Sequence, residues 1–249
     1  RSTAKLRVHV AWYFAIALFA AASGDVLNAR QAGPCDPPNG NPIVCENQLT
    51  GNPASEWDIS GAGDLNIQGF ATEISVDQGQ TVFFKIRSTT AYQLEIYRMG
   101  YYGGLGARNV ATIPSSATIA PIQPTCVTES STGLIDCGNW TTTASWAVPA
   151  TAVSGIYFAK ATRTGGGSSH IFFIVRDDDG QSDVLFQTAD TTWQAYNQYG
   201  GNSLYVGNPA GRAYKVSYNR PFTTRATSPE DWVFNAEYPM VRWLDANGY

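Results

Sequence analysis

The residues whose types and spacing suit chemistry gather between positions 191 and 205. This stretch reads TTWQAYNQYGGNSLY and places Trp193, Tyr196, Tyr199 and Tyr205 among amides and glycines. Such aromatic side chains can stack on a sugar ring, frame a small pocket or supply phenolate oxygens to a metal. A hard ferric ion favours phenolate and carboxylate oxygens over thiolates. The alternative is that these aromatic residues only seal an interface between two domains.

The sequence offers few histidines for catalysis or metal binding. The chain has two histidines, and His9 lies in a predicted export signal, so the mature chain keeps His170 alone. A Ser-His-Asp or Cys-His arrangement would have to be built around that residue. We interpret it instead as a histidine at the edge of a strand. A zinc site with several histidines is excluded within this segment.

Four cysteines indicate disulfides rather than a metal site. Cys35 and Cys45 are close in sequence, as are Cys126 and Cys137, and neither pair has the C-x-x-C spacing of a zinc site. Four cysteines allow three pairings, and the sequence does not choose among them. Local pairing, 35 with 45 and 126 with 137, is the simplest arrangement. Disulfides form in oxidising compartments.

Residues 1–24 have the character of a signal peptide. Arg1, Lys5 and Arg7 precede an unbroken apolar run at 11–22, which is short for a bilayer span. The alternative is an uncleaved membrane anchor. The sequence therefore predicts a secreted or periplasmic protein that meets the membrane only through this peptide. A net charge of -4, with no basic cluster after residue 10, argues against nucleic acid as a partner.

Alternating hydrophobicity predicts a β-sandwich over residues 64–178. Val82, Phe84 and Ile86 share one face of a predicted strand at 81–87, and residues 92–97 alternate in the same way. About seven short strands separated by turn residues are typical of an immunoglobulin-like antiparallel sandwich. Residues 25–63 are rich in proline, asparagine and glycine, and we expect them to be irregular.

Residues 179–249 are predicted to begin an α/β domain, after a solvated turn at Asp177–Asp179. The apolar run 184–188 is typical of a strand buried in a parallel sheet. A helix is predicted from Ser228 onward, with Ser228 as its N-cap and Pro239 causing a kink or two abutting helices. A single parallel strand has no partner, so we expect a fragment that stops where the next strand should begin.

Four motifs in the last third of the chain form a specific set. They are Ala195-Tyr-Asn197, Gly201-Asn-Ser-Leu-Tyr205, Ser217-Tyr-Asn-Arg-Pro-Phe222 and Arg242-Trp-Leu-Asp-Ala-Asn-Gly248. Together they resemble the large (beta) subunit of N,N-dimethylformamidase. Residues 96–108 resemble the sandwich that accompanies this domain in secreted bacterial relatives, and the resemblance extends over residues 41–249.

The resemblance implies a glutamine-amidotransferase-like α/β domain and a mononuclear iron held by two tyrosines and one glutamate. Such a metal would polarise an amide carbonyl and activate water. Tyr196 and Tyr205 match the tyrosine ligands, with Tyr199 as the reserve choice. The glutamate is expected from a later segment, because Glu237 does not stand where the resemblance would place it.

We therefore expect a secreted amidohydrolase-like protein that hydrolyses a carbon–nitrogen bond in a small-molecule amide. Its iron site would be completed by a missing C-terminal part, so the fragment itself is expected to be inactive, and dimethylformamide is not the expected substrate. A second hypothesis is a non-catalytic cell-surface or carbohydrate-binding protein. A third gives the sandwich only a structural role, in which it spaces or dimerises a partner domain.

Overall fold

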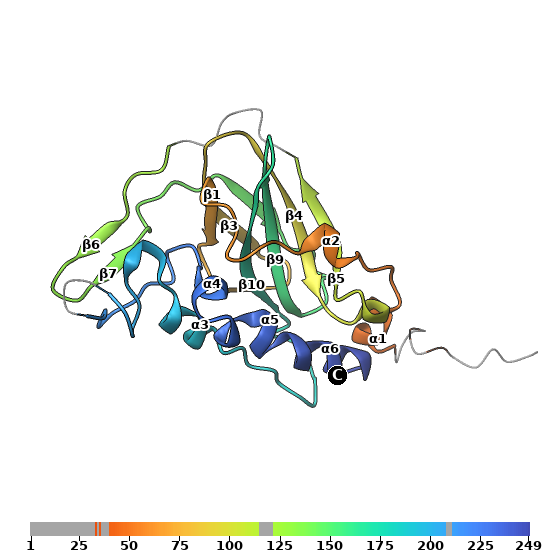
Figure 1. The fold of residues 1–249 in the computed structure, drawn as a ribbon. Helices are drawn as coiled ribbons and strands as arrows, with labels where there is room; N and C mark the ends of the chain where they lie inside the picture. The colour runs from red at the N-terminus through yellow and green to blue at the C-terminus, as the bar shows by residue number, and fades with distance from the viewer. Residues whose placement is uncertain (1–32, 34, 36–39, 115–121, 208–210) are drawn as a thin grey trace, which may run out of the picture. The chain divides into compact units, whose positions relative to one another are not determined.

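Two β-sheets form the body of the structure, which is a computed structural model. It describes residues 33, 35, 40–114, 122–207 and 211–249, so the predicted signal peptide lies outside the described residues. The three-stranded sheet has the order β1 (Ile67–Ala71), β3 (Thr81–Ser88), β8 (Ala144–Ala147). The five-stranded sheet has the order β2 (Ser75–Asp77), β10 (Ser168–Arg176), β9 (Gly155–Arg163), β4 (Tyr92–Met99), β5 (Ala107–Ile113) (Figure 1). Neighbouring strands are antiparallel, except that β2 runs parallel to β10.

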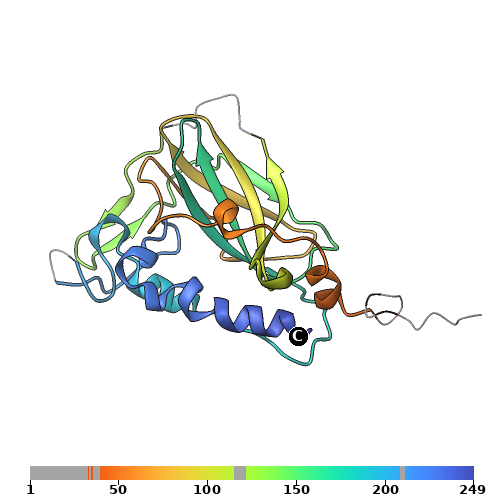
Figure 2. The same ribbon diagram turned by 45° about the vertical axis from the view of Figure 1, so that its right-hand side comes forward.

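Short helices and one hairpin complete the described chain. The helices are α1 (Pro42–Asn47), α2 (Ala54–Trp57), α3 (Asp190–Tyr196), α4 (Thr224–Thr227), α5 (Val233–Ala236) and α6 (Tyr238–Ala246), and β6 (Val127–Glu129) pairs with β7 (Leu134–Asp136). Figure 2 shows α5 and α6, in blue, following one another beneath the sheets. Among the described residues, none of the helices has the length and apolar character needed to cross a membrane.

The inner core between the two sheets follows the alternation seen in the sequence. Val82, Phe84 and Ile86 are fully buried in β3, while the residues between them are exposed or half-buried. Leu94 and Ile96 of β4 join the same cluster. The prediction of antiparallel, period-two strands is therefore confirmed in this part of the chain.

The five-stranded sheet is also covered on its outer face. Phe158 of β9 and Phe172 of β10 are paired across the sheet and lie 5.3 Å apart between ring centroids. They belong to a second core with Trp57, Trp193 and Trp232, which come from the segments before and after the strands. The helical segment after β10 therefore buries its apolar side chains against this sheet.

The end of the chain confirms one prediction and corrects two. A 3-10 turn at Pro229–Asp231 precedes α5, and α6 begins at Tyr238, so Pro239 does divide the helical run into abutting helices. However, Ser228 makes no side-chain capping hydrogen bond. The predicted buried strand at 184–188 is wrong, because this run has no strand structure and Leu185 is 91% exposed. An apolar run becomes a strand only where a sheet edge pairs with it.

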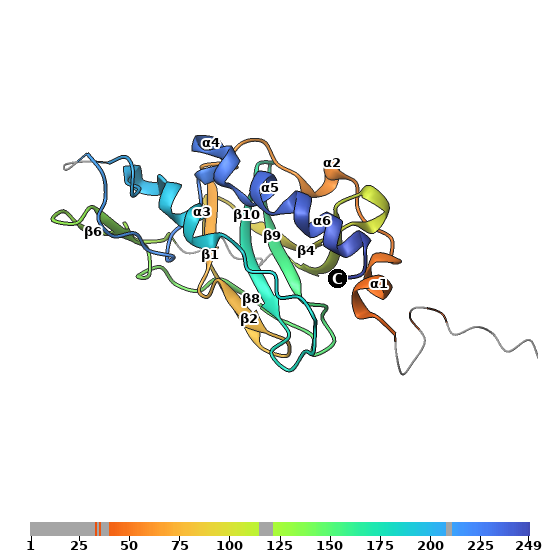
Figure 3. The same ribbon diagram turned by 90° about the horizontal axis from the view of Figure 1, so that it is seen from below.

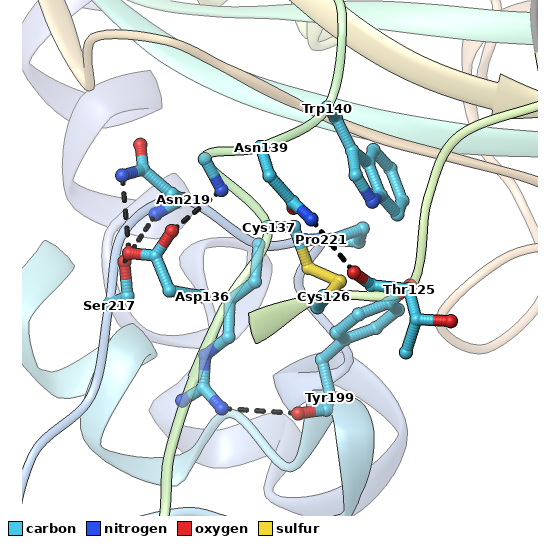
Figure 4. The surroundings of a disulfide bond; sticks show 12 residues. Thr125, Cys126, Asp136, Cys137, Asn139, Trp140, Tyr199, Ser217, Asn219 and Pro221 are labelled. Atoms are coloured by element: carbon cyan, nitrogen blue, oxygen red, sulfur yellow. Dashed lines mark hydrogen bonds between the residues drawn. A yellow bond between two sulfur atoms is a disulfide. The ribbon is translucent and has the colours of Figure 1, made fainter. Parts of the chain in front are cut away.

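Both disulfides have the predicted local pairing. Cys35 is bonded to Cys45, and Cys126 is bonded to Cys137. The second bond lies in a small core with Phe70 and Trp140. The bond joins the two ends of the β6–β7 hairpin. Figure 4 shows Tyr199, from the loop that follows α3, beside this disulfide.

Candidate functional site

Two of the predicted site residues meet at the end of α3. Tyr196 is the last residue of the helix, and Tyr205 returns to it after a turn; their rings stack with centroids 4.3 Å apart and planes 20° from parallel. Interaction of the Tyr196 hydroxyl, as donor, with the Tyr205 side chain raises the pKa of Tyr196 above its ordinary value, and the charge of an ionised Tyr205 acts in the same direction. Tyr205 is 58% exposed, so this side of the pair is open to solvent.

The backbone between these tyrosines is folded back by local hydrogen bonds. The Leu204 amide donates to the Ala195 carbonyl at 3.0 Å, and Ser203 Oγ accepts from the amides of Tyr205 (3.2 Å) and Val206 (3.0 Å). Gly200 has a φ of 79°, which few other residues adopt without strain. The glycine and serine of this loop therefore bring Tyr205 onto Tyr196.

A buried arginine also supports the loop between Tyr196 and Tyr205. The Arg220 guanidinium is fully buried and donates to Gln194 Oε1 at 3.0 Å and to the carbonyls of Asn197 (3.0 Å), Tyr199 (3.1 Å) and Asn202 (2.7 Å). These partners are neutral, and burial lowers the pKa of Arg220 to about 10. Arg220 therefore acts as a multiple hydrogen-bond donor that fixes the backbone between Tyr196 and Tyr205.

Asn197 completes this support from within the loop. Its side chain is fully buried, and its Nδ2 donates to the Pro221 carbonyl at 3.0 Å. Its Oδ1 accepts from the amides of Tyr199 (3.2 Å) and Thr223 (2.9 Å). Asn197 and Arg220 lie in two of the family-like motifs, yet neither residue was predicted to have a role. The signal that could have found them is a charged and an amide residue within compact motifs.

Trp193 does not take part in the exposed site. It is fully buried against Phe172 and Trp232, and its Nε1 donates to both Glu237 carboxylate oxygens at 3.0 Å. Glu237 also accepts from the Ala189 amide at 2.8 Å, and burial raises the pKa of its carboxyl group. Trp193 is therefore a core residue that packs the segment after β10 against the five-stranded sheet.

Tyr199, the reserve choice for a metal ligand, packs against a different group of residues from the stacked pair. Its ring packs against the Cys126–Cys137 disulfide, and burial raises its pKa.

Asp136, which precedes Cys137 of this disulfide, accepts hydrogen bonds from Ser217 Oγ at 2.5 Å and from the Gly138 amide at 2.6 Å (Figure 4). Burial acts to raise the pKa of Asp136, but these hydrogen bonds outweigh it and lower the pKa.

His170 is a buried structural residue rather than one at a strand edge. It lies within β10, and its Nε2 is 2.7 Å from the Trp57 carbonyl oxygen. Its ring lies 4.7 Å from that of Phe158. Burial lowers its pKa to about 3, so the imidazole is neutral at physiological pH.

Metal ligands other than tyrosine are not clustered in the part of the chain that the structure describes. There, no three side chains of histidine, cysteine, aspartate or glutamate come together to hold an ion. The aspartate run after β10 is engaged otherwise, since Asp178 pairs with Arg176 at 2.8 Å.

Comparisons with known proteins identify a family for most of the described chain. Residues 93–249 match the family described as N,N-dimethylformamidase beta subunit-like, C-terminal. No curated protein matches the chain. Among solved structures, a crystal structure of the titin domains Z1Z2 in complex with telethonin is 16% identical and covers 48% of this chain and 51% of that chain. Its TM-score of 0.21 is too low to support any conclusion.

Proposed function

The chain belongs to the N,N-dimethylformamidase beta subunit-like family, and from this membership we propose that it is a secreted amidohydrolase-like protein. Its reaction is hydrolysis of a carbon–nitrogen bond in a small-molecule amide, at a site that includes Tyr196 and Tyr205. The observation that carries the proposal is the stacked pair itself, which joins two separate family-like motifs at one point. The two disulfides support export, because such bonds form in oxidising compartments.

The tyrosine pair fits part of the donor set of a ferric ion. The two rings stack with centroids 4.3 Å apart, and neither side chain is buried, so their phenol oxygens can approach one ion. When bound, iron would polarise the amide carbonyl and lower the pKa of a bound water. The charges of Asp231 and Glu230 act on Tyr196, whereas the Glu237 carboxylate is occupied by Trp193 and Ala189.

The residues around the pair have a positioning role in this proposal. Arg220 and Asn197 hold the loop so that Tyr205 stays against Tyr196. The Tyr196 phenol must lose its proton to bind an ion, and its raised pKa makes that loss less favourable. Metal binding should therefore release protons and strengthen as the pH rises. We also propose that residues 64–178 form an immunoglobulin-like sandwich and that residues 179–249 begin the α/β domain implied by the resemblance.

The test is ferric ion binding by the purified chain, followed through the visible charge-transfer band of tyrosinate–iron and by metal analysis. We expect Tyr196→Phe and Tyr205→Phe each to abolish the band. Tyr214→Phe is the matched control, because Tyr214 is 57% exposed and belongs to neither motif. Unchanged iron content in both site variants would refute the assignment. Tyr199→Phe tests the reserve ligand in the same assay.

The second candidate function is carbohydrate binding, and exposed aromatic side chains favour it. Tyr205 and Tyr214 are more than half exposed, and the Arg212 guanidinium lies 4.9 Å above the Tyr214 ring. Flat exposed rings of this kind stack on sugars. Glycan binding that Tyr214→Ala weakens, in a protein that binds no iron, would favour this function over the amidohydrolase-like one.

A further inference from the structure

The linker between β10 and α3, residues 177–188, is exposed and makes few hydrogen bonds. Figure 3 shows it as a long loop between these two elements. Residues 177–187 are all exposed, and the Leu185 side chain is 91% exposed. Residues 181–187 make no hydrogen bond with any other described residue. The backbone of this stretch is therefore free to pair with another molecule.

Both ends of the free stretch are anchored to the rest of the fold. Before it, the Asp178 amide donates to Asp77 Oδ1 at 3.1 Å. After it, the Ala189 amide donates to Glu237 Oε1 at 2.8 Å. A break between these anchors would leave the contacts of β10 and of α3 in place.

Other exposed apolar residues of the described chain are held more firmly. Leu65 is 72% exposed, but its carbonyl accepts from Arg87 Nη2 at 3.5 Å. The amides of Asp64 and Asn66 on either side are also bonded, to the Ser168 carbonyl at 3.0 Å and to Asp64 Oδ1 at 2.8 Å. Apart from Leu185 and Phe186, each exposed leucine or aromatic residue that the structure describes lies in a helix or strand or has a backbone hydrogen bond.

We propose that the linker is a processing site for an endoprotease that cleaves after large apolar side chains. Such an enzyme binds its substrate as an extended strand and pairs with the substrate backbone, which residues 181–187 leave free. No proline interrupts residues 181–189. Water is added across the Leu185–Phe186 or the Phe186–Gln187 peptide bond, which leaves a new carboxylate and a new amine.

The two products should stay together as a two-chain protein. Trp193 and Trp232 lie after the linker and pack against Phe172 of β10 in the second core. The buried ion pair of Arg98 and Asp245, at 2.7 Å, also joins the two parts. Both disulfides lie before the linker, so the two chains are held by non-covalent contacts. The inference does not rest on the proposed function.

Chymotrypsin, which cleaves after aromatic residues and leucine, tests the site on the purified folded chain. Mass spectrometry of the products at successive times identifies each bond that is cut within residues 40–249. We expect the first cut after Leu185 or Phe186. Cleavage after Leu65 should be at least about tenfold slower, because its hydrogen bonds must open before the protease can bind.

Two controls separate the linker from exposure alone. The double variant Leu185→Ser with Phe186→Ser removes both side chains that the protease requires and should lose the first cut. Leu65→Ser is the matched control, because it removes another strongly exposed leucine, and cleavage of the linker should be unchanged. Trypsin should make no cut within residues 177–188, which contain neither lysine nor arginine. A trypsin time course that matches wild type shows that each variant is folded.

Size-exclusion chromatography of the cleaved protein tests the two-chain product. Both fragments should elute together at the volume of the intact chain, and denaturing electrophoresis without reductant should separate them. A first cut elsewhere in residues 40–249, or a linker cut that persists in the double variant, overturns the processing site. Fragments that elute separately without denaturant overturn the two-chain product.

Discussion

Replacing Asp245 by asparagine should destabilise the protein strongly. The Asp245 carboxylate is 6% exposed, and it accepts hydrogen bonds from two Arg98 nitrogens and from Asn47 Nδ2 at 2.9 Å. Asparagine keeps the shape of the side chain but leaves the buried Arg98 guanidinium without a counter-charge. Breaking a buried ion pair in this way costs about 3–5 kcal/mol of unfolding free energy.

Urea unfolding at pH 7, followed by tryptophan fluorescence, measures this loss. Asp178→Asn is the matched control, because Asp178 pairs with Arg176 at the same kind of distance, 2.8 Å, but with side chains 51% and 38% exposed. Solvent screening limits that loss to less than about 1 kcal/mol. A double variant, Arg98→Met with Asp245→Leu, removes both charges and should cost less than Asp245→Asn. Equal losses for Asp245→Asn and Asp178→Asn would refute the reasoning.

Two further predictions concern the cores. The pKa of His170 is lowered to about 3 in the folded state, so the stability contributed by its neutral ring is present above about pH 6.5 and is lost as the pH falls toward 3. Between pH 7 and pH 5, the free energy of unfolding measured in urea should therefore fall less in His170→Leu than in wild type. The difference should be at most about 1.4 kcal/mol for each pH unit. Parallel plots of unfolding free energy against pH for the two proteins would contradict this. Replacing both Cys126 and Cys137 by serine should cost about 3 kcal/mol in the same assay at pH 7, because their bond closes a loop of 11 residues' separation; an unchanged midpoint would contradict it.

Features set by local patterns could be predicted from the sequence. The alternation of Val82, Phe84 and Ile86 matches their burial, since a strand with one face on a core has a period of two. The local disulfide pairing and the helix break at Pro239 also follow from neighbouring residues. The approach of Tyr196 to Tyr205 was expected only through family resemblance.

Features set by long-range packing could not be predicted. The apolar run 184–188 looks like a buried strand, yet its place is decided by which sheet edges are available. The second core was missed because residues 190–246 supply its cover from far along the chain. Arg98 and Arg220 are charged, and composition gives no sign that either guanidinium is buried, since that depends on partners elsewhere in the fold.

The link between Arg98 and Asp245 also imposes an order on folding. The two residues are 147 positions apart, and Asn41 donates to the Gly248 carbonyl across 207 positions. The sandwich strands can collapse around their inner core while the last helix is still being synthesised. The end of β4 and helix α1 acquire their partners only when α6 arrives, because closing such distant contacts comes late. Until then, a nascent chain would carry an uncompensated guanidinium at one end of a partly formed sheet, open to chaperones or to misassembly.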